Sequence, residues 1–347
     1  MIPRPVWVVL ALMVLGCGCA NRPPAKPETL ERYTFERPQM GLPFRVIVYT
    51  RDAGEAAQAA DAVWTRIAEL NASLSDYEAE SELSRLSRTG GSGRWIPLGP
   101  DLARVLTTAQ EISRRSDGAF DVTVGPQVLL WRRARRQRVL PSPEALAAAR
   151  AATGWEHLHL RRRRALWEAR LDRAGMRLDL GGIAKGYALD EAADVLRKRG
   201  ITRFLVSGGG DMVLGDPPPE KHGWTVEAGV FDATNAPPPR MLSLKRTGLA
   251  TSGDTFQRAE IGGVRYSHIV DPRTGMGLTD HSLVTVVAPS GMIADALSKV
   301  ICVLGPDRGL PLARRYGADV FLLRKPGAVV EVTLSPGFAR RWVTTED

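Results

Sequence analysis

Leu178-Asp-Leu-Gly-Gly-Ile-Ala-Lys-Gly-Tyr187 is the stretch of sequence that best defines the fold of this chain. Residues 177–180 are predicted to form a short strand that ends at Gly181-Gly182, followed by a helix over 184–199 that Gly200 stops. Paired glycines let the backbone approach a ligand closely, and the free N–H groups of a helix start favour a phosphate, to which the lysine of the stretch adds charge. Because there is neither a Walker loop nor a GxGxxG motif, the spacing alone favours a plain strand–helix turn over a ligand site.

The sequence on either side mixes strand and helix patterns. Apolar residues alternate over 43–50, as in a strand, and recur at helical spacing over 56–70 and 102–112. Because strands and helices do not alternate as regular βαβ units, we expect an α+β fold, a single mixed α/β domain over residues 31–347 with two lobes around a cleft. Further predicted elements are strands at 204–207, 224–228, 241–245, 266–270 and 283–288, and a helix over 292–303 with Ser290 as N-cap and Gly305 beyond its end.

The N-terminal residues have the features of an export signal and a tether. The apolar run over 6–15 is too short to span a bilayer, which predicts a signal peptide over residues 1–16. Cys17 is then the predicted site of lipidation, with Cys19 as the alternative, and residues 17–30 are predicted to be a lipid-anchored tether. An ordinary cleaved signal, or a disulfide between the two cysteines, remains open.

The formal net charge of +9 arises largely from two arginine runs, at residues 132–138 and 161–164. No nucleic-acid-binding motif accompanies them and only 6% of residues are aromatic, which favours a solvated or membrane-facing surface and no nucleic-acid partner. Cys302 lies in an apolar segment and is predicted to be a buried hydrophobe rather than a reactive thiol. The sequence contains no Cys/His zinc pattern.

Two polar side chains late in the chain are candidates for chemistry. His268 has polar neighbours at the end of a predicted strand and could act as a general base at neutral pH. Asp295 lies in the first turn of the last long helix, where a carboxylate either complements the helix dipole or binds Mg²⁺ as a hard oxygen ligand. Taken alone, each pattern is more often structural.

These segments occur together and in one order, and in this the chain resembles the ApbE family, the FAD:protein FMN transferases. The resemblance extends from about residue 40 to residue 323, nearly the whole predicted domain, and residues 81–86 look like an early helix of the family. The matching segments are 117–126, 179–187, 208–211, 250–253, 266–275 and 294–297.

The resemblance implies a function and a cellular location. Members of the family take FAD, release AMP and attach FMN through its phosphate to a threonine hydroxyl of a partner, typically a membrane or periplasmic electron-transfer protein. It therefore implies a flavin-binding cleft, FAD as substrate, Mg²⁺, and an acceptor flavoprotein with a target threonine. Together with the signal sequence, it implies a lipid-anchored protein on the periplasmic side of a bacterial membrane.

The resemblance also implies roles for single residues. His268 would be the base that removes the threonine proton, and Asp295 a catalytic carboxylate that binds the metal together with the backbone carbonyl of Ala184. An aromatic ring at Tyr77 could stack on a ring of FAD. The positions implied to contact FAD are Met40, Tyr77, Ala119, Phe120, Asp121, Asp179, Gly181, Lys185, His268 and Ile269.

Lys299 departs from the family pattern, which usually has threonine there as a further metal ligand. An ammonium group has only donors and cannot coordinate a cation through its side chain. Three outcomes are open: Lys299 turns away and leaves its backbone carbonyl as the ligand, which we favour slightly; its ammonium replaces the metal; or the site is inactive. Two other functions accordingly stay open, an FAD pyrophosphatase that forms FMN and AMP, and an FAD-binding lipoprotein without catalysis.

Overall fold

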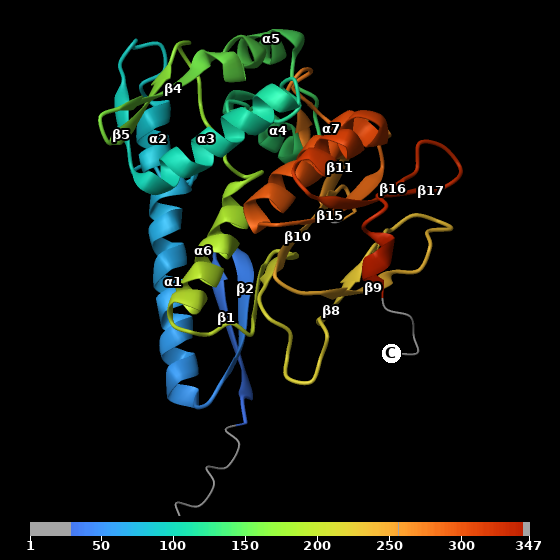
Figure 1. Cartoon of the computed structure of the whole chain (residues 1–347). Helices are drawn as coiled ribbons and strands as arrows, with labels where there is room; N and C mark the ends of the chain where they lie inside the picture. The colour runs from blue at the N-terminus through green and yellow to red at the C-terminus, as the bar shows by residue number, and fades with distance from the viewer. Residues whose placement is uncertain (1–28, 256, 343–347) are drawn as a thin grey trace, which may run out of the picture.

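The computed structural model describes residues 29–255 and 257–342, and its centre is an eight-stranded sheet (Figure 1). All neighbouring strands in this sheet are antiparallel. Smaller sheets and several helices surround it, which confirms the predicted α+β class. Across the sheet the strands run in the order β1 (Glu31–Gln39), β2 (Leu42–Thr50), β6 (Phe204–Gly208), β7 (Asp211–Leu214), β10 (Thr247–Gly253), β15 (Ser282–Ala288), β16 (Asp319–Arg324) and β17 (Glu331–Leu334).

Three helices cover one face of the sheet: α1 (Ala53–Leu74), α6 (Ala184–Lys198) and α7 (Gly291–Arg315) (Figure 1). The first two pack on β2 and β6, and α7 packs on β10, β15 and β16. The apolar spacing predicted the first two helices because each presents one buried stripe to the strands. Cys302 of α7 is buried in this layer, as expected, and burial raises the pKa of its thiol to about 12.

The opposite face of the sheet is covered by the hairpin of β8 (Trp224–Ala228) and β9 (Arg240–Leu244). Alternate residues of β15 serve the two layers: Val284 and Val286 face α7, whereas Leu283 packs with the hairpin. The strand is therefore buried on both faces, which explains why its apolar residues are not confined to alternate positions.

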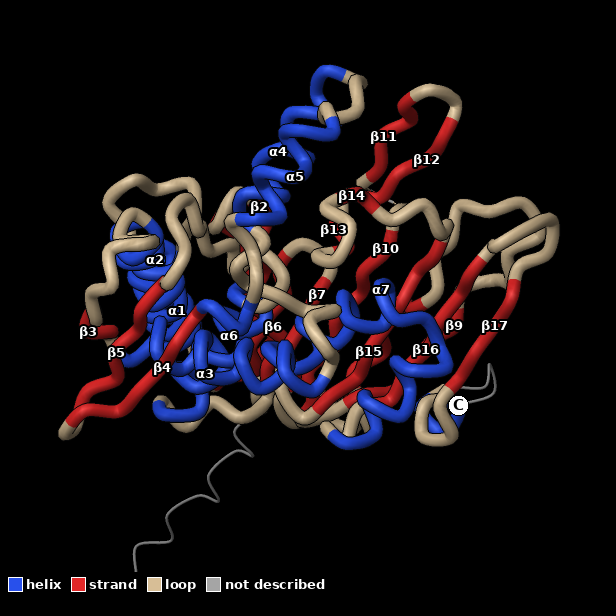
Figure 2. Tube along the Cα trace, turned by 90° about the horizontal axis from the view of Figure 1, so that it is seen from above, coloured by secondary structure: helices blue, strands red, loops and turns tan. Residues whose placement is uncertain are grey.

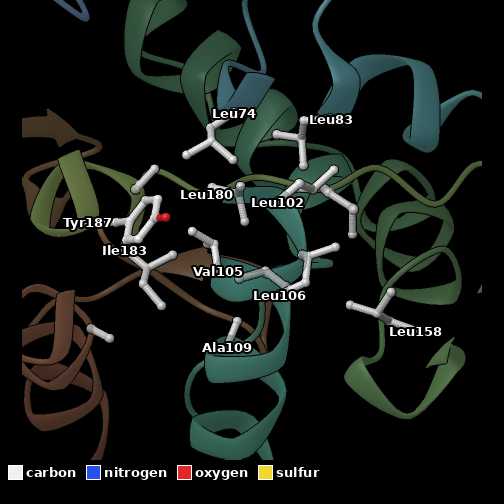
Figure 3. Close-up of a cluster of buried hydrophobic side chains, with 14 of the residues drawn as sticks. Leu74, Leu83, Leu102, Val105, Leu106, Ala109, Leu158, Leu180, Ile183 and Tyr187 are labelled. Carbon is white, nitrogen blue, oxygen red and sulfur yellow. The ribbon is translucent and has the colours of Figure 1, made fainter. Parts of the chain in front are cut away.

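A second core lies beside the sheet. It contains α2 (Glu82–Ser87), α3 (Pro100–Arg115) and a three-stranded sheet in the order β3 (Ile96–Leu98), β5 (Leu166–Leu171), β4 (Leu158–Arg163). Figure 3 shows side chains of α3 packed toward the residues that precede and begin α6. Because the start of α6 belongs to this core and its later turns to the sheet layer, α6 begins where the two cores meet. This arrangement matches the two lobes that we expected.

A further group of helices and strands projects from one side of the molecule (Figure 2). The indole of Trp131 donates to the carbonyl of Ser267 at 3.0 Å and lies edge-on to Tyr266, with ring centroids 5.3 Å apart. This contact joins the α4 region to the β11–β12 hairpin. The elements of this group are α4 (Gly125–Gln137), α5 (Pro143–Ala151), β11 (Arg258–Ile261) and β12 (Val264–Ser267), with β13 (Val270–Asp271) and β14 (Met276–Gly277) next to them in the chain. Two 3₁₀ turns complete the described elements: Trp155–His157, which precedes β4, and Ala339–Arg341, which follows β17.

The predicted ends of α7 are confirmed in part. The Ser290 hydroxyl accepts a hydrogen bond from the N–H of Ile293 at 3.2 Å, as an N-cap does. Gly305 leaves the helical conformation, with φ at 69°, but a second helical segment follows it and reaches Arg315. The break was therefore predicted correctly, whereas the continuation was missed.

Two strand predictions need correction. Residues 177–180 are not a strand: Arg177 makes a single bridge to Val124, and the N–H of Asp179 donates to the carbonyl of Val122 at 2.8 Å. Their apolar side chains pack inward, but this segment has no partner strand in the described part of the chain. The strand predicted over 266–270 is divided, because β12 ends at Ser267 and β13 begins at Val270.

The predicted signal peptide, Cys17, Cys19 and nearly all of the tether lie outside the described residues. Among the helices that are described, none has both the length and the apolar content needed to cross a membrane. The first strand in the described part of the chain begins at Glu31.

Candidate active site

The turn before α6 is shaped by Asp179 and by two glycines. The Asp179 carboxylate accepts a hydrogen bond from the N–H of Gly181 at 2.8 Å, which closes the turn locally. A Cβ atom on Gly182 would lie 3.2 Å from the ring of Phe120 and 3.8 Å from Cγ of Lys299. The missing side chain therefore lets the backbone pass between residues from two distant segments.

Four charged side chains meet at the start of α6. Lys185 forms ion pairs with Asp211 and with Asp295, the latter at 3.9 Å between Nζ and Oδ1. Lys299 forms an ion pair with the same Oδ1 of Asp295, and the N–H of Gly186 donates to Oδ2 at 2.9 Å. Asp295 is completely buried and Asp211 is 1% exposed, so the two ammonium groups compensate two desolvated carboxylates. We call Lys185, Asp211, Asp295 and Lys299 the ion-pair cluster.

Burial and charge act in opposite directions within this cluster. Burial lowers the pKa of Lys185 to about 8, although the carboxylate of Asp295 opposes the shift. Burial would raise the pKa of Asp295, but the neighbouring Lys185 and Lys299 ammonium groups hold it below its usual value. Asp295 is therefore ionised at neutral pH.

His268 lies close enough to the ion-pair cluster for the charges of Lys185 and Lys299 to affect its pKa. Burial, together with the positive charges of Lys299, Arg135 and Lys185, lowers the pKa of His268 to about 4. Its Nδ1 atom is 3.2 Å from the carbonyl oxygen of Gln257, which can only accept, so Nδ1 carries the proton. His268 is thus a neutral imidazole at pH 7 with the lone pair on Nε2.

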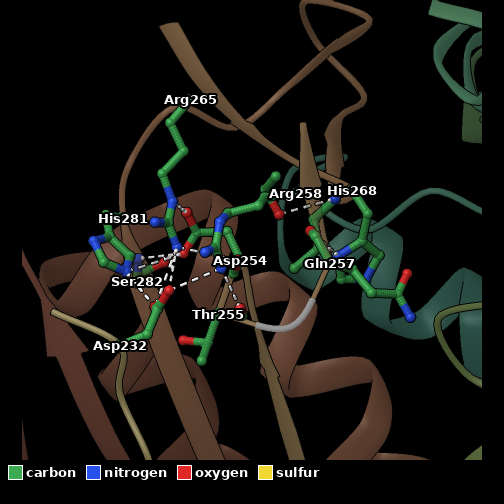
Figure 4. Close-up of polar contacts among 11 residues, drawn as sticks. Asp232, Asp254, Thr255, Gln257, Arg258, Arg265, His268, His281 and Ser282 are labelled. Atoms are coloured by element: carbon green, nitrogen blue, oxygen red, sulfur yellow. Dashed lines mark hydrogen bonds and ion pairs between the residues drawn. The ribbon is translucent and has the colours of Figure 1, made fainter. Parts of the chain in front are cut away.

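A network of polar side chains braces the loop that holds His268 (Figure 4). Arg265 forms ion pairs with Asp254 and with Asp232, the latter at 3.2 Å. His281 lies 3.0 Å from Asp232, and Asp254 accepts from the N–H of Ser282 at 3.2 Å. No role was predicted for any of these residues, because their partners are separated by 11 to 49 positions along the chain.

Arg132 joins two of the predicted flavin-contacting residues. Its guanidinium group donates to Asp179 at 2.9 Å and to Asp76 at 2.6 Å, and lies 4.5 Å from the ring centroid of Tyr77. Tyr77 is 76% exposed, so the face of its ring that points away from Arg132 is accessible. Asp76 and Tyr77 line a pocket of about 380 Å³ together with Arg177. The first arginine run is therefore not only the solvated or membrane-facing surface that we predicted, since Arg132 is built into the site.

The other predicted residues make separate contacts. Asp121 accepts from the N–H and the hydroxyl of Thr123, both at 2.7 Å, and burial raises its pKa to about 6. Met40 lies in the turn between β1 and β2, with φ at 51°, and packs against both cores. The remaining predicted residues, Ala119, Phe120, Ala184 and Ile269, are buried.

A second pocket, of about 620 Å³, lies away from these residues. Its wall includes Trp95, Trp155, Trp167, Gln110 and Arg170, and contains none of the residues predicted for the site. The pocket that Tyr77 lines is the smaller of the two, but it is the one beside the predicted residues.

Comparison with known proteins identifies the family. Residues 40–322 match the ApbE family. The chain belongs to this family. The FAD:protein FMN transferase of Escherichia coli (strain K12) is 32% identical over 336 residues, which cover 95% of each chain. The FAD:protein FMN transferase of Haemophilus influenzae (strain ATCC 51907 / DSM 11121 / KW20 / Rd) is 33% identical over 261 residues, covering 74% of this chain and 75% of the relative.

Solved ApbE structures have the same fold. The flavin transferase ApbE from Vibrio cholerae superposes with a TM-score of 0.80 at 29% identity, covering 90% of this chain and 99% of the other. The apo form of the Pseudomonas stutzeri flavinyl transferase ApbE gives 0.78 at 29% identity, covering 91% and 98%. The ApbE resemblance of the sequence motifs is thereby confirmed for both family and fold.

The side chains at the position where the ApbE resemblance implied Mg²⁺ do not fit that ion. Mg²⁺ takes oxygen ligands in near-octahedral geometry, but Asp295 directs one oxygen to Gly186 and the other to two ammonium groups. Within residues 29–255 and 257–342, His, Cys, Asp and Glu side chains nowhere gather in threes to hold a metal. The orientation that we favoured for Lys299 is wrong, since its side chain points toward Asp295 and not away from it.

Proposed function

We propose that this protein transfers FMN from FAD to a threonine hydroxyl of an acceptor protein and releases AMP. Relatives that match 95% and 74% of the chain are named for FMN transfer from FAD to protein. The observation that carries the proposal is the neutral His268 beside the ammonium groups of Lys185 and Lys299. A base next to fixed positive charge is what attack of a hydroxyl on a diphosphate requires.

The step is a displacement at phosphorus. The threonine oxygen forms a bond to the phosphorus atom of the FMN half, and the bond from that phosphorus to the bridging oxygen breaks. AMP leaves with the bonding electron pair, and the proton of the hydroxyl passes to Nε2 of His268. Lys185 and Lys299 stabilise the negative charge of the phosphate oxygens, because buried ammonium groups are weakly screened by solvent.

We further propose that FAD contacts the residues that the ApbE resemblance implied. Tyr77 offers an exposed aromatic face, and its neighbour Arg132 orders the adjoining carboxylates.

We also propose that Cys17 carries a lipid, so that the enzyme works on the periplasmic side of a bacterial membrane. The acceptor would then be an exported or membrane-bound electron-transfer subunit. The apolar run over 6–15 and the adjoining cysteines support this cellular location.

The test is a product analysis with the full-length protein in detergent. The protein is incubated with FAD and with a membrane extract from cells that lack it, in Mg²⁺ and separately in EDTA. AMP is measured by chromatography and covalent flavin by fluorescence of protein bands in a denaturing gel. We expect equal amounts of both products, and we expect His268→Ala to lower the rate by about a hundredfold or more while still binding FAD.

Two results would overturn the proposal. AMP and free FMN without a fluorescent protein band would make the protein an FAD pyrophosphatase. FAD recovered intact, with no AMP under either condition, would make it a flavin-binding protein without catalysis.

A further inference from the structure

Asp295 is the most enclosed acidic group of the candidate site. It is completely buried, and each of its oxygens already has a partner from the chain. Adding a divalent cation at Oδ1 would place it beside the two ammonium groups of Lys185 and Lys299. Like charges at such distances repel strongly in a buried site, so Lys299 would have to leave before a metal could bind.

Lys299 also borders the turn where a phosphate would be held. Its Cγ lies 3.8 Å from the position of a Cβ on Gly182, and its charge lowers the pKa of His268. The lysine therefore lies between the carboxylate, the glycine turn and the base. An ammonium group has three donors, so it can pair with Asp295 and donate to a phosphate oxygen at the same time.

The charges of the cluster support the same conclusion. Lys185 and Lys299 contribute two positive charges, and Asp211 and Asp295 contribute two negative charges. With a residue that lacks charge at position 299, the cluster would be negative by one and would repel a diphosphate unless a metal bound. The positive charge of Lys299 brings the net charge of the cluster to zero, so that no metal is needed to offset the carboxylates.

We propose that the Lys299 ammonium takes the place of a divalent cation, so that this chain binds the diphosphate of FAD without metal. The inference rests on the proposed function only in taking FAD as the ligand. Asp295 then acts as a positioning residue, which holds Lys299 toward the glycine turn.

The first experiment measures FAD binding, by quenching of flavin fluorescence, with full-length protein that has been dialysed against EDTA. We expect the Kd in EDTA and in excess Mg²⁺ to agree within about twofold. Lys299→Met should weaken binding about tenfold or more in both conditions, because a hydrogen bond to a charged group is lost. Lys299→Thr should bind weakly in EDTA and recover in Mg²⁺. Lys198→Met, an exposed lysine on α6, is the matched control and should bind like the wild type.

The second experiment uses Mn²⁺ alone, followed by its electron paramagnetic resonance signal. We expect wild-type protein and Asp295→Asn to give the same titration, and Lys299→Thr to gain one bound ion. Thermal unfolding and the charge-preserving variant Lys299→Arg, which should keep its FAD affinity in EDTA, separate a binding defect from misfolding.

Two outcomes would overturn the inference: FAD binding that falls tenfold or more on metal removal, or one Mn²⁺ bound by the wild type and lost in Asp295→Asn. Neither readout needs turnover. A protein that binds FAD equally with and without metal but releases no AMP would refute the proposed function and leave this inference standing.

Discussion

Gly186 holds α6 against α7, and we predict that a single methyl group at this position disrupts the contact. A Cβ on Gly186 would lie 2.6 Å from the carbonyl carbon of Gly291 and 2.7 Å from Cβ of Asp295. Real Cβ contacts are longer than 3.0 Å, and the obstacles are backbone and the root of a buried side chain. The two helices must therefore move apart in Gly186→Ala.

The size of the effect follows from two contributions. Overpacking of a close-packed contact destabilises by about 1–3 kcal/mol. The movement also lengthens the hydrogen bond from the Gly186 N–H to Asp295, now 2.9 Å, and a bond to a charged group contributes about 1.5–3 kcal/mol. Together we expect the free energy of unfolding to fall by about 3–5 kcal/mol. At about 2–4 °C for each kcal/mol, the Tm should fall by about 10 °C.

The assay is thermal unfolding by circular dichroism, with urea denaturation to obtain the free energy. Gly327→Ala is the control, because a Cβ there meets nothing within 4 Å. If the Tm of Gly186→Ala lies within about 2 °C of the control, the helices have room to adjust and the close-packing argument is refuted.

Three further predictions concern Arg132 and two of the residues that are predicted to contact FAD. Arg132→Met should lower the free energy of unfolding by about 3 kcal/mol, because it leaves the buried Asp179 without its ion-pair partner. Urea denaturation checks this, with Arg133→Met at the exposed neighbouring position as the control. Equal denaturation midpoints for the two variants would contradict it. Tyr77→Ala should weaken FAD binding about three- to tenfold and Tyr77→Phe hardly at all, if stacking is the contribution; a fluorescence titration in which both variants behave alike would count against stacking. Burial raises the pKa of Asp121 to about 6, from about 3.9 in the unfolded chain. The stabilisation by the protonated carboxyl is therefore full below about pH 3.9 and is lost as the pH rises through about 6. Relative to wild type, Asp121→Asn should therefore gain about 2–3 kcal/mol between pH 4 and pH 7, and a difference that does not change with pH would refute the shift.

The sequence predicted those elements whose signals are local. The helices α1, α3 and α6 each carry one apolar stripe, and the Ser290 cap acts within three residues. Strand β1 was missed because it is an edge strand with charged side chains and gains its order from pairing with β2. Its neighbours in the sheet could not be read from its own sequence.

The site was predicted from family motifs rather than from geometry, and the residues that were missed show why. Arg132 was assigned to a surface because its partners, Asp76 and Asp179, lie 56 and 47 positions away. Asp211 belonged to a matching segment, after three glycines, and could have been singled out as a buried acidic partner. Asp211 can pair with Lys185 only because the β6–β7 hairpin reaches the start of α6. No local sequence pattern predicts this tertiary contact.

The ion-pair cluster and His268 together suggest how the site selects its substrate. The positive charges of Lys185 and Lys299 lower the pKa of His268, and therefore its strength as a base. A diphosphate between them would carry negative charge and oppose that effect, so the base would strengthen when the anion is bound. An uncharged ligand of the same shape would leave the imidazole weakly basic. Repulsion between a protonated His268 and the two ammonium groups would thus link binding of a phosphate to activation of the base, through residues contributed by α6, α7 and the loop after β12.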